Sequence, residues 1–195
     1  MTIITTTLKQ IRKHSPCEDG WADLLKHLGK TKADDEPLRF STILESNGID
    51  DALWSLRALS QKHHGKIRHL AADYAERVLY LFEKEYPEDK RPREAIQAAR
   101  DHAEEKATAA GATGDTAWDE RAARATGATG AARAAGDAGA AAWDAARAAR
   151  VARVAGAARA ARATGATGAT AWDAATAARD AEKKIQGELL IKYFG

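Results

Sequence analysis

Cysteine is nearly absent from this chain, and long apolar runs are absent altogether. The single cysteine, Cys17, has no partner for an internal disulfide, which indicates a reducing, cytoplasmic environment. The opening stretch "MTIITTTLKQIRKH" lacks the apolar core and the small-residue cleavage site of a secretory signal. No run of roughly 18 apolar residues occurs anywhere, so we expect no membrane-spanning helix and no membrane partner.

An excess of charge of either sign is also absent. The 30 lysines and arginines nearly balance the 28 aspartates and glutamates, and the formal net charge is +2. A domain that binds nucleic acid strongly and without regard to sequence is normally far more basic. The charge balance therefore argues against such a binder, and we expect no sequence-specific nucleic-acid partner either.

Motifs that carry catalysis or bind metals are missing as well. His69 and Asp73 lie four residues apart, a spacing seen at metal sites, but two ligands do not make a site, and we favour a surface or helix-capping role. Cys17 beside His14 or His27 lacks a third group, so we interpret this cysteine as structural. The repeated "GATG" has neither the lysine of a phosphate-binding loop nor a preceding strand. We therefore expect no catalytic residues, no metal and no cofactor.

Residues 1–106 have the pattern of a globular helical segment. Ser15 is predicted to cap a helix that has the following proline in its first turn and that stops at Gly29. The clearest prediction is a helix over residues 66–85, where apolar residues recur at steps of three and four and Pro87 closes the pattern. Further helices are expected after Pro37 up to "SNG", from Asp50, and from about Asp89, which is a candidate cap; "TIITTT" is a weak strand candidate.

The composition changes near residue 107. From there to about residue 180, about half the residues are alanine, and arginine carries all the positive charge. Alanine favours helices, and helices with such small side chains must pack backbone close to backbone. The tail 181–195 regains large apolar side chains and is expected to form a closing helix. We therefore predict that residues 107–195 form a closely packed Ala/Gly/Trp-rich helical array, either as a second domain or continuous with the first.

One motif, G-x-x-G-x-x-x-W-D, occurs three times within this segment, at 111–119, 136–144 and 165–173. Such spacing is typical of short stacked helical units. If each copy is one continuous helix, both glycines and the tryptophan share a face. If the second glycine ends a helix, the tryptophan lies in the first turn of the next, and the aspartate after it lies near a helix N-terminus. Asp115 and Asp137 are good caps, which favours the second geometry for the first two copies.

The repeated tryptophans admit two interpretations. A tryptophan among small residues is most simply a buried plug whose N–H needs a partner, and the following aspartate is a candidate partner. Alternatively, the glycines admit a ligand to the backbone, the indole stacks on it, and nearby arginines bind its phosphate or carboxylate groups. Arginines at three-residue steps are also typical of a solvent-exposed helix face. The candidate binding residues in this segment are Trp118, Trp143, Trp172, Asp144, Arg121, Arg124, Arg147 and Arg150.

A second candidate surface lies in the first segment, in the charged turn between two predicted helices. The stretch "YPEDKRPRE" places Arg91 and Arg93 beside several acidic residues. We interpret this turn either as a solubilising loop with helix caps or as a binding edge.

The same region carries a family resemblance. The stretches "SPCEDGWADLLKHLG" and "LAADYAERVLYLFEKEYPEDKRPREAIQAARDHA", with the Ala/Arg/Trp helices that follow, resemble the helical putative immunity proteins found beside bacterial polymorphic toxins. The resemblance extends over most of the chain and is most specific at "DYAERVL" and "YPEDKRPREAIQAAR". It implies an all-α, non-enzymatic protein that neutralises another component of a microbial conflict. A related helical protein used by a phage against host defence would admit a small-molecule target.

We therefore expect an all-α protein that acts by sequestration. In the first hypothesis it is an immunity-type inhibitor that covers a toxin or a defence protein through a broad interface with Trp and Arg anchors. In the second it is a phage counter-defence sponge that holds an anionic nucleotide signal between tryptophan and arginine side chains. An enzyme is the third and least favoured class. An Ala-rich face also allows pairing with a second copy of the chain.

Overall fold

The computed structural model describes residues 3–109, 138–165 and 167–195, and helices make up most of them, which confirms the all-α class. Two strands of two residues each, β1 and β2, pair antiparallel, with Thr5 opposite Arg39 and Thr6 opposite Leu38. Among the described helices, none is both long enough and apolar enough to cross a membrane. The elements are β1 (Thr5–Thr6), α1 (Leu8–Arg12), α2 (Glu18–His27), β2 (Leu38–Arg39), α3 (Phe40–Ser55), the 3-10 turns η1 (Leu56–Ala58) and η2 (Gln61–His63), α4 (His64–Glu85), α5 (Arg91–Ala109), α8 (Ala138–Ala163) and α9 (Gly168–Phe194).

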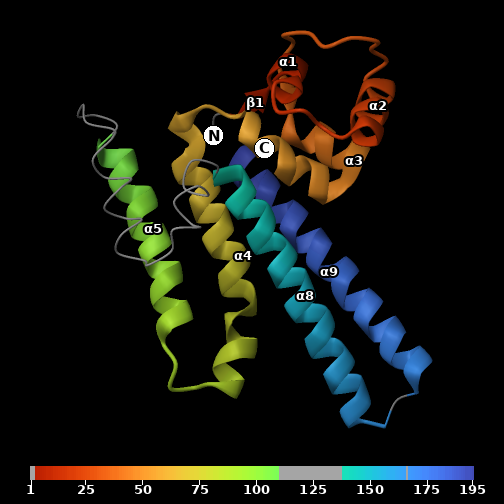
Figure 1. The fold of residues 1–195 in the computed structure, drawn as a ribbon, viewed down its shortest axis with the longest axis vertical. Coiled ribbons are helices and arrows are strands. Elements are labelled where there is room, and N and C mark those ends of the chain that lie inside the picture. Colours follow the sequence, from red (N-terminus) through yellow and green to blue (C-terminus); the bar gives the residue numbers. More distant parts are fainter. Residues whose placement is uncertain (1–2, 110–137, 166) are drawn as a thin grey trace.

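Helices α4, α8 and α9 extend away from a small cap formed by α1, α2 and α3, and α5 lies beside α4 on the side away from α8 (Figure 1). Helix α4 packs against α5 and α8, and α8 packs against α9, which runs antiparallel to it. Both chain ends lie near the cap, whereas the α4–α5 turn (86–90) and the α8–α9 turn (164–167) lie at the opposite extreme. We call this opposite extreme, the two turns and the helix ends beside them, the distal end.

The start of α2 differs from its prediction. Ser15 has φ of +54°, and its N–H donates to Arg12 O at 3.2 Å, so this serine closes the turn after α1 instead of capping the next helix. The N-cap of α2 is Cys17, which makes no side-chain capping bond. The predicted stop is confirmed, because Gly29 follows the helix with φ of +64°, a conformation that glycine adopts without strain.

The other predicted helices of the first segment are confirmed with small shifts of their ends. Two were expected around "SNG", and the structure joins them as α3 across a break at Gly48, where φ is +81° and ψ is −178°. Helix α4 begins two residues before its prediction and ends before Pro87. Asp89 Oδ1 accepts a hydrogen bond from Arg91 N at 3.1 Å, as expected of a residue that caps α5. The weak strand candidate contains β1.

Two long helices, not short stacked units, form the described part of the Ala-rich segment. Helices α8 and α9 contain 26 and 27 residues, so the predicted short units are wrong here. Gly156 stays inside α8, where a Cβ would lie 3.5 Å from Leu81 of α4, so this glycine gives close packing and not a break. The chain turns only after α8, where Gly165 has φ of +76°. Alanine's helix propensity evidently outweighs the cost of an isolated glycine.

The hydrophobic core lies where the cap meets the four-helix part. Phe40 of α3 and Phe194 of α9 are fully buried, with ring centroids 5.6 Å apart. Leu190 of α9 and Ala146 of α8 belong to the same buried cluster as the cap residues. The tail 181–195, expected to form a closing helix, is the helical last part of α9 and completes this core.

Candidate functional site

A buried polar cluster lies at the centre of the helical part. Glu182 and Gln186 of α9 are fully buried, and Arg150 of α8 is 8% exposed. Two nitrogens of Arg77, Nε and Nη2, each donate to a carboxylate oxygen of Glu182 at 3.0 Å. Arg153 Nε lies 3.4 Å from the Glu182 carboxylate. The carboxylate is therefore shared by guanidinium groups from α4 and α8.

Gln186 links this cluster to further residues of α4 and α8, and through Arg150 the cluster reaches one more helix, α3. Its side-chain oxygen accepts a hydrogen bond from Arg150 Nη1 at 2.8 Å, and its Nε2 donates to Ala146 O at 2.9 Å. Tyr74 donates its hydroxyl to Gln186 O at 2.9 Å, and burial raises the pKa of this tyrosine well above its ordinary value. Arg150 Nη2 also pairs with Asp50 of α3. These bonds connect α3, α4, α8 and α9, which indicates a structural function for the cluster.

A second group of charged residues connects α4, α5 and α9. Arg100 Nη2 donates to Asp73 Oδ1 at 2.8 Å and to Glu76 Oε2 at 2.6 Å. Tyr193 donates its hydroxyl to Asp73 Oδ2 at 2.8 Å. The bond from Arg100 lowers the pKa of Glu76, and burial and the bond to Asp73 raise the pKa of Tyr193 to about 12. Asp73 is thus engaged by two residues of the fold.

Within the described ranges, no three His, Cys, Asp or Glu side chains form a group able to hold a metal.

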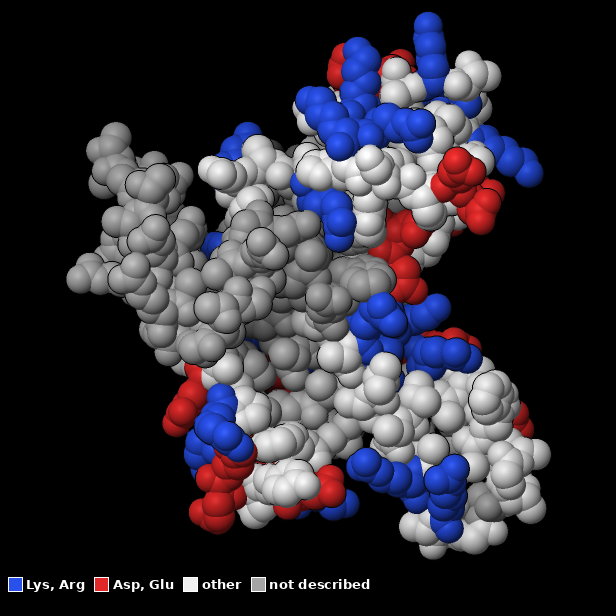
Figure 2. Space-filling model, in the orientation of Figure 1, with Lys and Arg blue, Asp and Glu red and all other residues white. Residues whose placement is uncertain are grey.

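The distal end exposes large side chains to solvent. Trp172 near the start of α9 is 71% exposed, and Tyr86 in the α4–α5 turn is 54% exposed. Arg159 Nη1 of α8 lies 3.8 Å from a carboxylate oxygen of Glu85 of α4. This long ion pair connects the α8 side of the distal end with the α4 side. In Figure 2, positive and negative side chains mix over the α4–α5 turn, and positive side chains gather over the lower end of α8.

The two arginines predicted at the α4–α5 turn are held in place by carboxylates. Arg91 Nε and Nη2 donate to the two carboxylate oxygens of Asp89, at 2.9 and 2.6 Å, and this pairing lowers the pKa of Asp89 to about 2. Arg93 Nε and Nη2 donate to the two oxygens of Glu83, each at 2.8 Å, and lower the pKa of that carboxyl. Both arginines are exposed at the surface, so their remaining N–H groups face solvent.

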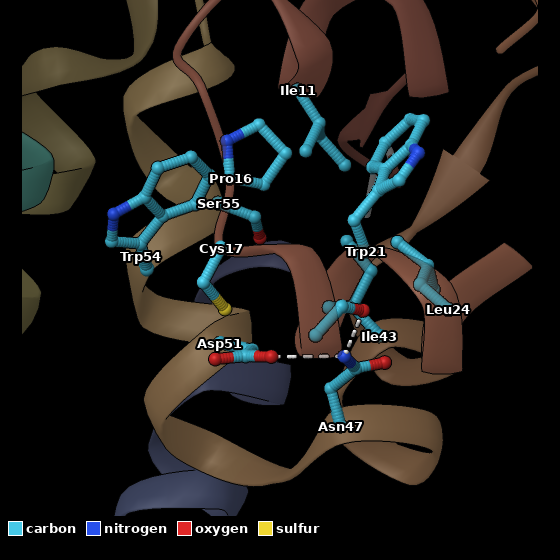
Figure 3. A pocket seen from close by; sticks show the side chains of 11 residues that line it. Ile11, Pro16, Cys17, Trp21, Leu24, Ile43, Asn47, Asp51, Trp54 and Ser55 are labelled. Atoms are coloured by element: carbon cyan, nitrogen blue, oxygen red, sulfur yellow. Dashed lines mark hydrogen bonds between the residues drawn. The ribbon is translucent and has the colours of Figure 1, made fainter.

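A small apolar pocket lies in the cap, between α2 and α3. Its volume is about 140 Å³, and Figure 3 shows Trp21 and Trp54 on opposite sides of it. Asn47 Nδ2 donates to Gly20 O at 2.7 Å and to Asp51 Oδ2 at 2.9 Å, which forms the polar side of the pocket. An apolar cavity of roughly 150 Å³ holds one benzene ring, so this pocket fits a single side chain or ring.

Comparison with protein families gives one finding, for residues 57–142. These residues match the family described as Imm-5 like putative immunity protein. The predicted resemblance to immunity proteins is therefore confirmed over this range, which we call the Imm-5-like segment. It is less than half of the chain and leaves out "SPCEDGWADLLKHLG" at 15–29. Comparisons with curated proteins and with solved structures give no match.

The Imm-5-like segment contains α4 and α5, and thus Arg91, Arg93 and Tyr86. The other predicted binding residues divide into three groups. Trp172 and Arg147 are exposed, whereas Arg150 is buried and bonded within the fold. Trp118, Arg121 and Arg124 lie outside the described residues, as do the side chains of Trp143 and Asp144.

The third copy of the Trp-Asp motif does not have the geometry of a buried plug. Gly165 ends the turn after α8 and Gly168 begins α9, so the second glycine starts a helix there. Trp172 lies in the second turn of α9 and is mostly exposed. Asp173 follows it and is not in the first turn, so it does not lie near the helix N-terminus as one of the two alternative geometries required. For this copy, the interpretation as core is wrong.

Trp172 and Arg150 do not come together in one site. Arg150 bonds to Gln186, and Trp172 precedes Gln186 by 14 positions in one continuous helix. A helix rises about 1.5 Å per residue, so the two lie roughly 20 Å apart along α9. Sequence reasoning also missed the pocket residues Trp21 and Trp54, because helix periodicity alone did not distinguish them from ordinary core positions.

Proposed function

We propose that this chain neutralises a protein toxin by binding it, with no catalysis of its own. The observation that carries this proposal is the match of residues 57–142 to a family of putative immunity proteins. An immunity protein that acts by binding needs a stable scaffold and an accessible surface. The buried polar cluster and the shared core supply the scaffold.

We assign the binding surface to the distal end. Tryptophan, tyrosine and arginine dominate the binding energy of protein interfaces. Trp172, Tyr86, Arg91 and Arg93 expose these three residue types at one end of the molecule. Asp89 and Glu83 fix the two arginines before any partner arrives, which lowers the entropy that binding would cost.

The nucleotide-sponge hypothesis receives less support from the described residues. It required tryptophan and arginine side chains to converge on one ligand. Trp172 and Arg150 lie far apart along α9, and Arg150 is occupied by Asp50 and Gln186. The described candidate residues of the Ala-rich segment therefore do not form the site that this hypothesis required.

Two measurements test the proposal on a toxin encoded beside this chain's gene. Co-expression of the chain should restore growth to cells that express the toxin. Titration of purified toxin with the chain should abolish toxin activity at a fixed molar ratio, because a binder is consumed as it acts. Loss of all toxin activity at a small fraction of that ratio would indicate catalysis, and failure to restore growth would contradict toxin neutralisation.

A further inference from the structure

A second hollow lies near the cap, where α4 begins. Its volume is about 620 Å³, and residues from β1, α1, η1, η2 and the start of α4 line it. We call it the α4 hollow. None of the described residues that line it is acidic, whereas five carry or can gain positive charge. These five are His14, Arg57, Lys62, His63 and His64.

Two buried polar groups on the wall of the α4 hollow have no hydrogen-bond partner. Thr6 is 4% exposed, and its hydroxyl is unpartnered. The Nε of Arg57 is also buried without a partner, and the Arg57 guanidinium lies over the Trp54 ring, 4.7 Å from its centroid. Buried polar groups in native proteins are nearly always bonded, and each exception calls for an explanation. Both atoms have almost no accessible surface, so each would gain its missing partner by a side-chain rotation toward a ligand in the hollow that accepts hydrogen bonds.

The N-terminus of α4 adds positive potential to the same place. The α4 helix is 22 residues long, and its first turn holds no acidic residue. Its N-cap, His63, makes no side-chain capping bond. The His64 N–H already donates to Gln61 O, but the helix dipole still makes such a terminus attractive to anions. Burial, and to a smaller extent the nearby charges of Lys62, Lys66 and His64, lower the pKa of His63.

We propose that the α4 hollow binds a small phosphorylated molecule. Arg57 and Lys62 supply charge, the Thr6 hydroxyl supplies a hydrogen-bond donor, and the dipole of α4 adds positive potential. A phosphate group presents three oxygens to donors that come from several directions, and arginine forks match its geometry. The volume lies within the range of roughly 300–1,000 Å³ that is usual for small-molecule sites. This site is separate from the distal end and does not depend on the proposed toxin binding.

Titration of the purified full chain with inorganic pyrophosphate tests this site. Saturable binding of one equivalent is expected by calorimetry, and the His63 ring signals should shift in NMR spectra. Arg57→Gln and, separately, Lys62→Gln should each weaken binding by roughly tenfold, since each removes a charge-assisted contact. Arg12→Gln is the matched control, because Arg12 also lies over a tryptophan ring, 5.2 Å from Trp21, but does not line the hollow.

Three results would overturn the proposal. The first is absence of saturable pyrophosphate binding. The second is equal weakening by Arg12→Gln and by both variants of the hollow. The third is stronger binding of a glutamate-rich peptide of matched charge than of pyrophosphate, which would assign the hollow to an acidic protein segment. Lys62 is exposed, so its variant keeps the test informative even if Arg57→Gln unfolds the cap.

Discussion

The carboxylate of Glu182 is buried beside the Ala-rich helices α8 and α9, where the guanidinium groups of Arg77 and Arg153 contact it. Removing one partner of a buried ion pair leaves the other charge buried without compensation. Glu182→Gln should therefore lower the free energy of unfolding by about 3 kcal/mol, measured by urea denaturation. The variant keeps the size of the side chain, so the loss reports charge and hydrogen bonding.

Glu83 provides the matched control for Glu182. It also receives two hydrogen bonds from one arginine, Arg93 on α5, but this pair lies at the surface. Water screens exposed pairs, so Glu83→Gln should shift the unfolding midpoint far less than Glu182→Gln does. Equal effects of the two variants would contradict a structural function of the buried polar cluster.

The raised pKa of Tyr193 predicts how the free energy of unfolding changes at alkaline pH. Its pKa is about 12 in the folded chain, whereas an unfolded tyrosine titrates near 10. The stabilisation is fully present below about pH 10 and is lost between about pH 10 and 12, because the unfolded chain releases this proton first. Tyr193→Phe should make the decline of stability over this range shallower, as measured by denaturation at each pH. A decline as steep for Tyr193→Phe as for the unmodified chain would contradict the assignment.

Single residues were the hardest features to predict from the sequence. Nothing in the spacing of Arg147, Arg150 and Arg153 distinguishes the buried arginine from its exposed neighbour. Which of them becomes buried depends on α4 and α9, which are distant in the sequence. Trp172 suggested a buried plug, but alanine neighbours form no pocket deep enough to cover an indole.

Helix ends were easier to predict, because local residues determine them. Gly29, Pro87 and Asp89 act through backbone conformation and capping, and all three perform as predicted. The prediction that Ser15 caps α2 was wrong because this serine closes the turn after α1. A residue type that often caps helices serves a different function here. The prediction of short units was wrong because it rested on the spacing of the motif copies, whereas α8 continues through Gly156, which packs against Leu81 of α4.

Two glycines in the first turns of helices, one tightly packed and one open, give a prediction together with its control. Gly65 lies in the first turn of α4, where a Cβ would be 3.1 Å from the backbone oxygen of Ala103 on α5. Gly65→Ala should therefore separate α4 from α5 and cost about 1–3 kcal/mol. Gly168 lies in the first turn of α9 with nothing within 4 Å of such a Cβ, so Gly168→Ala should be neutral or slightly stabilising. Thermal unfolding of both variants checks this, and equal destabilisation would contradict the tight α4–α5 contact.

At the scale of the whole molecule, α9 connects the cap to the rest of the chain. Phe194 near its end is fully buried against Phe40, whereas Trp172 near its start is mostly exposed. Phe194→Ala should lower the stability of the entire chain by about 4 kcal/mol in one cooperative transition. Trp172→Ala removes a larger ring but should change stability by no more than about 0.5 kcal/mol. Calorimetry would show two transitions for Phe194→Ala if the cap unfolded independently, and that result would contradict a shared core.

The proposed function rests on two features of the whole molecule: a rigid helical scaffold and the aromatic and arginine side chains at its distal end. The Imm-5-like segment supplies Arg91, Arg93 and Tyr86, and α9 adds Trp172 from outside that segment. Ile3, which is 42% exposed, lies two residues before β1, and β1 pairs with β2 at the start of α3, so Ile3 gives a control position at the cap.

The dissociation constant of the complex with the neighbouring toxin tests the central claim most directly. The double variant Trp172→Ala, Tyr86→Ala should weaken binding at least about tenfold, since interface hot spots of these types contribute roughly 2 kcal/mol or more. Its thermal midpoint should stay close to that of the unmodified chain, and Ile3→Ala should bind as the unmodified chain does. Unchanged affinity of the double variant, at full occupancy of the toxin, would contradict the assignment of the distal end as the binding surface.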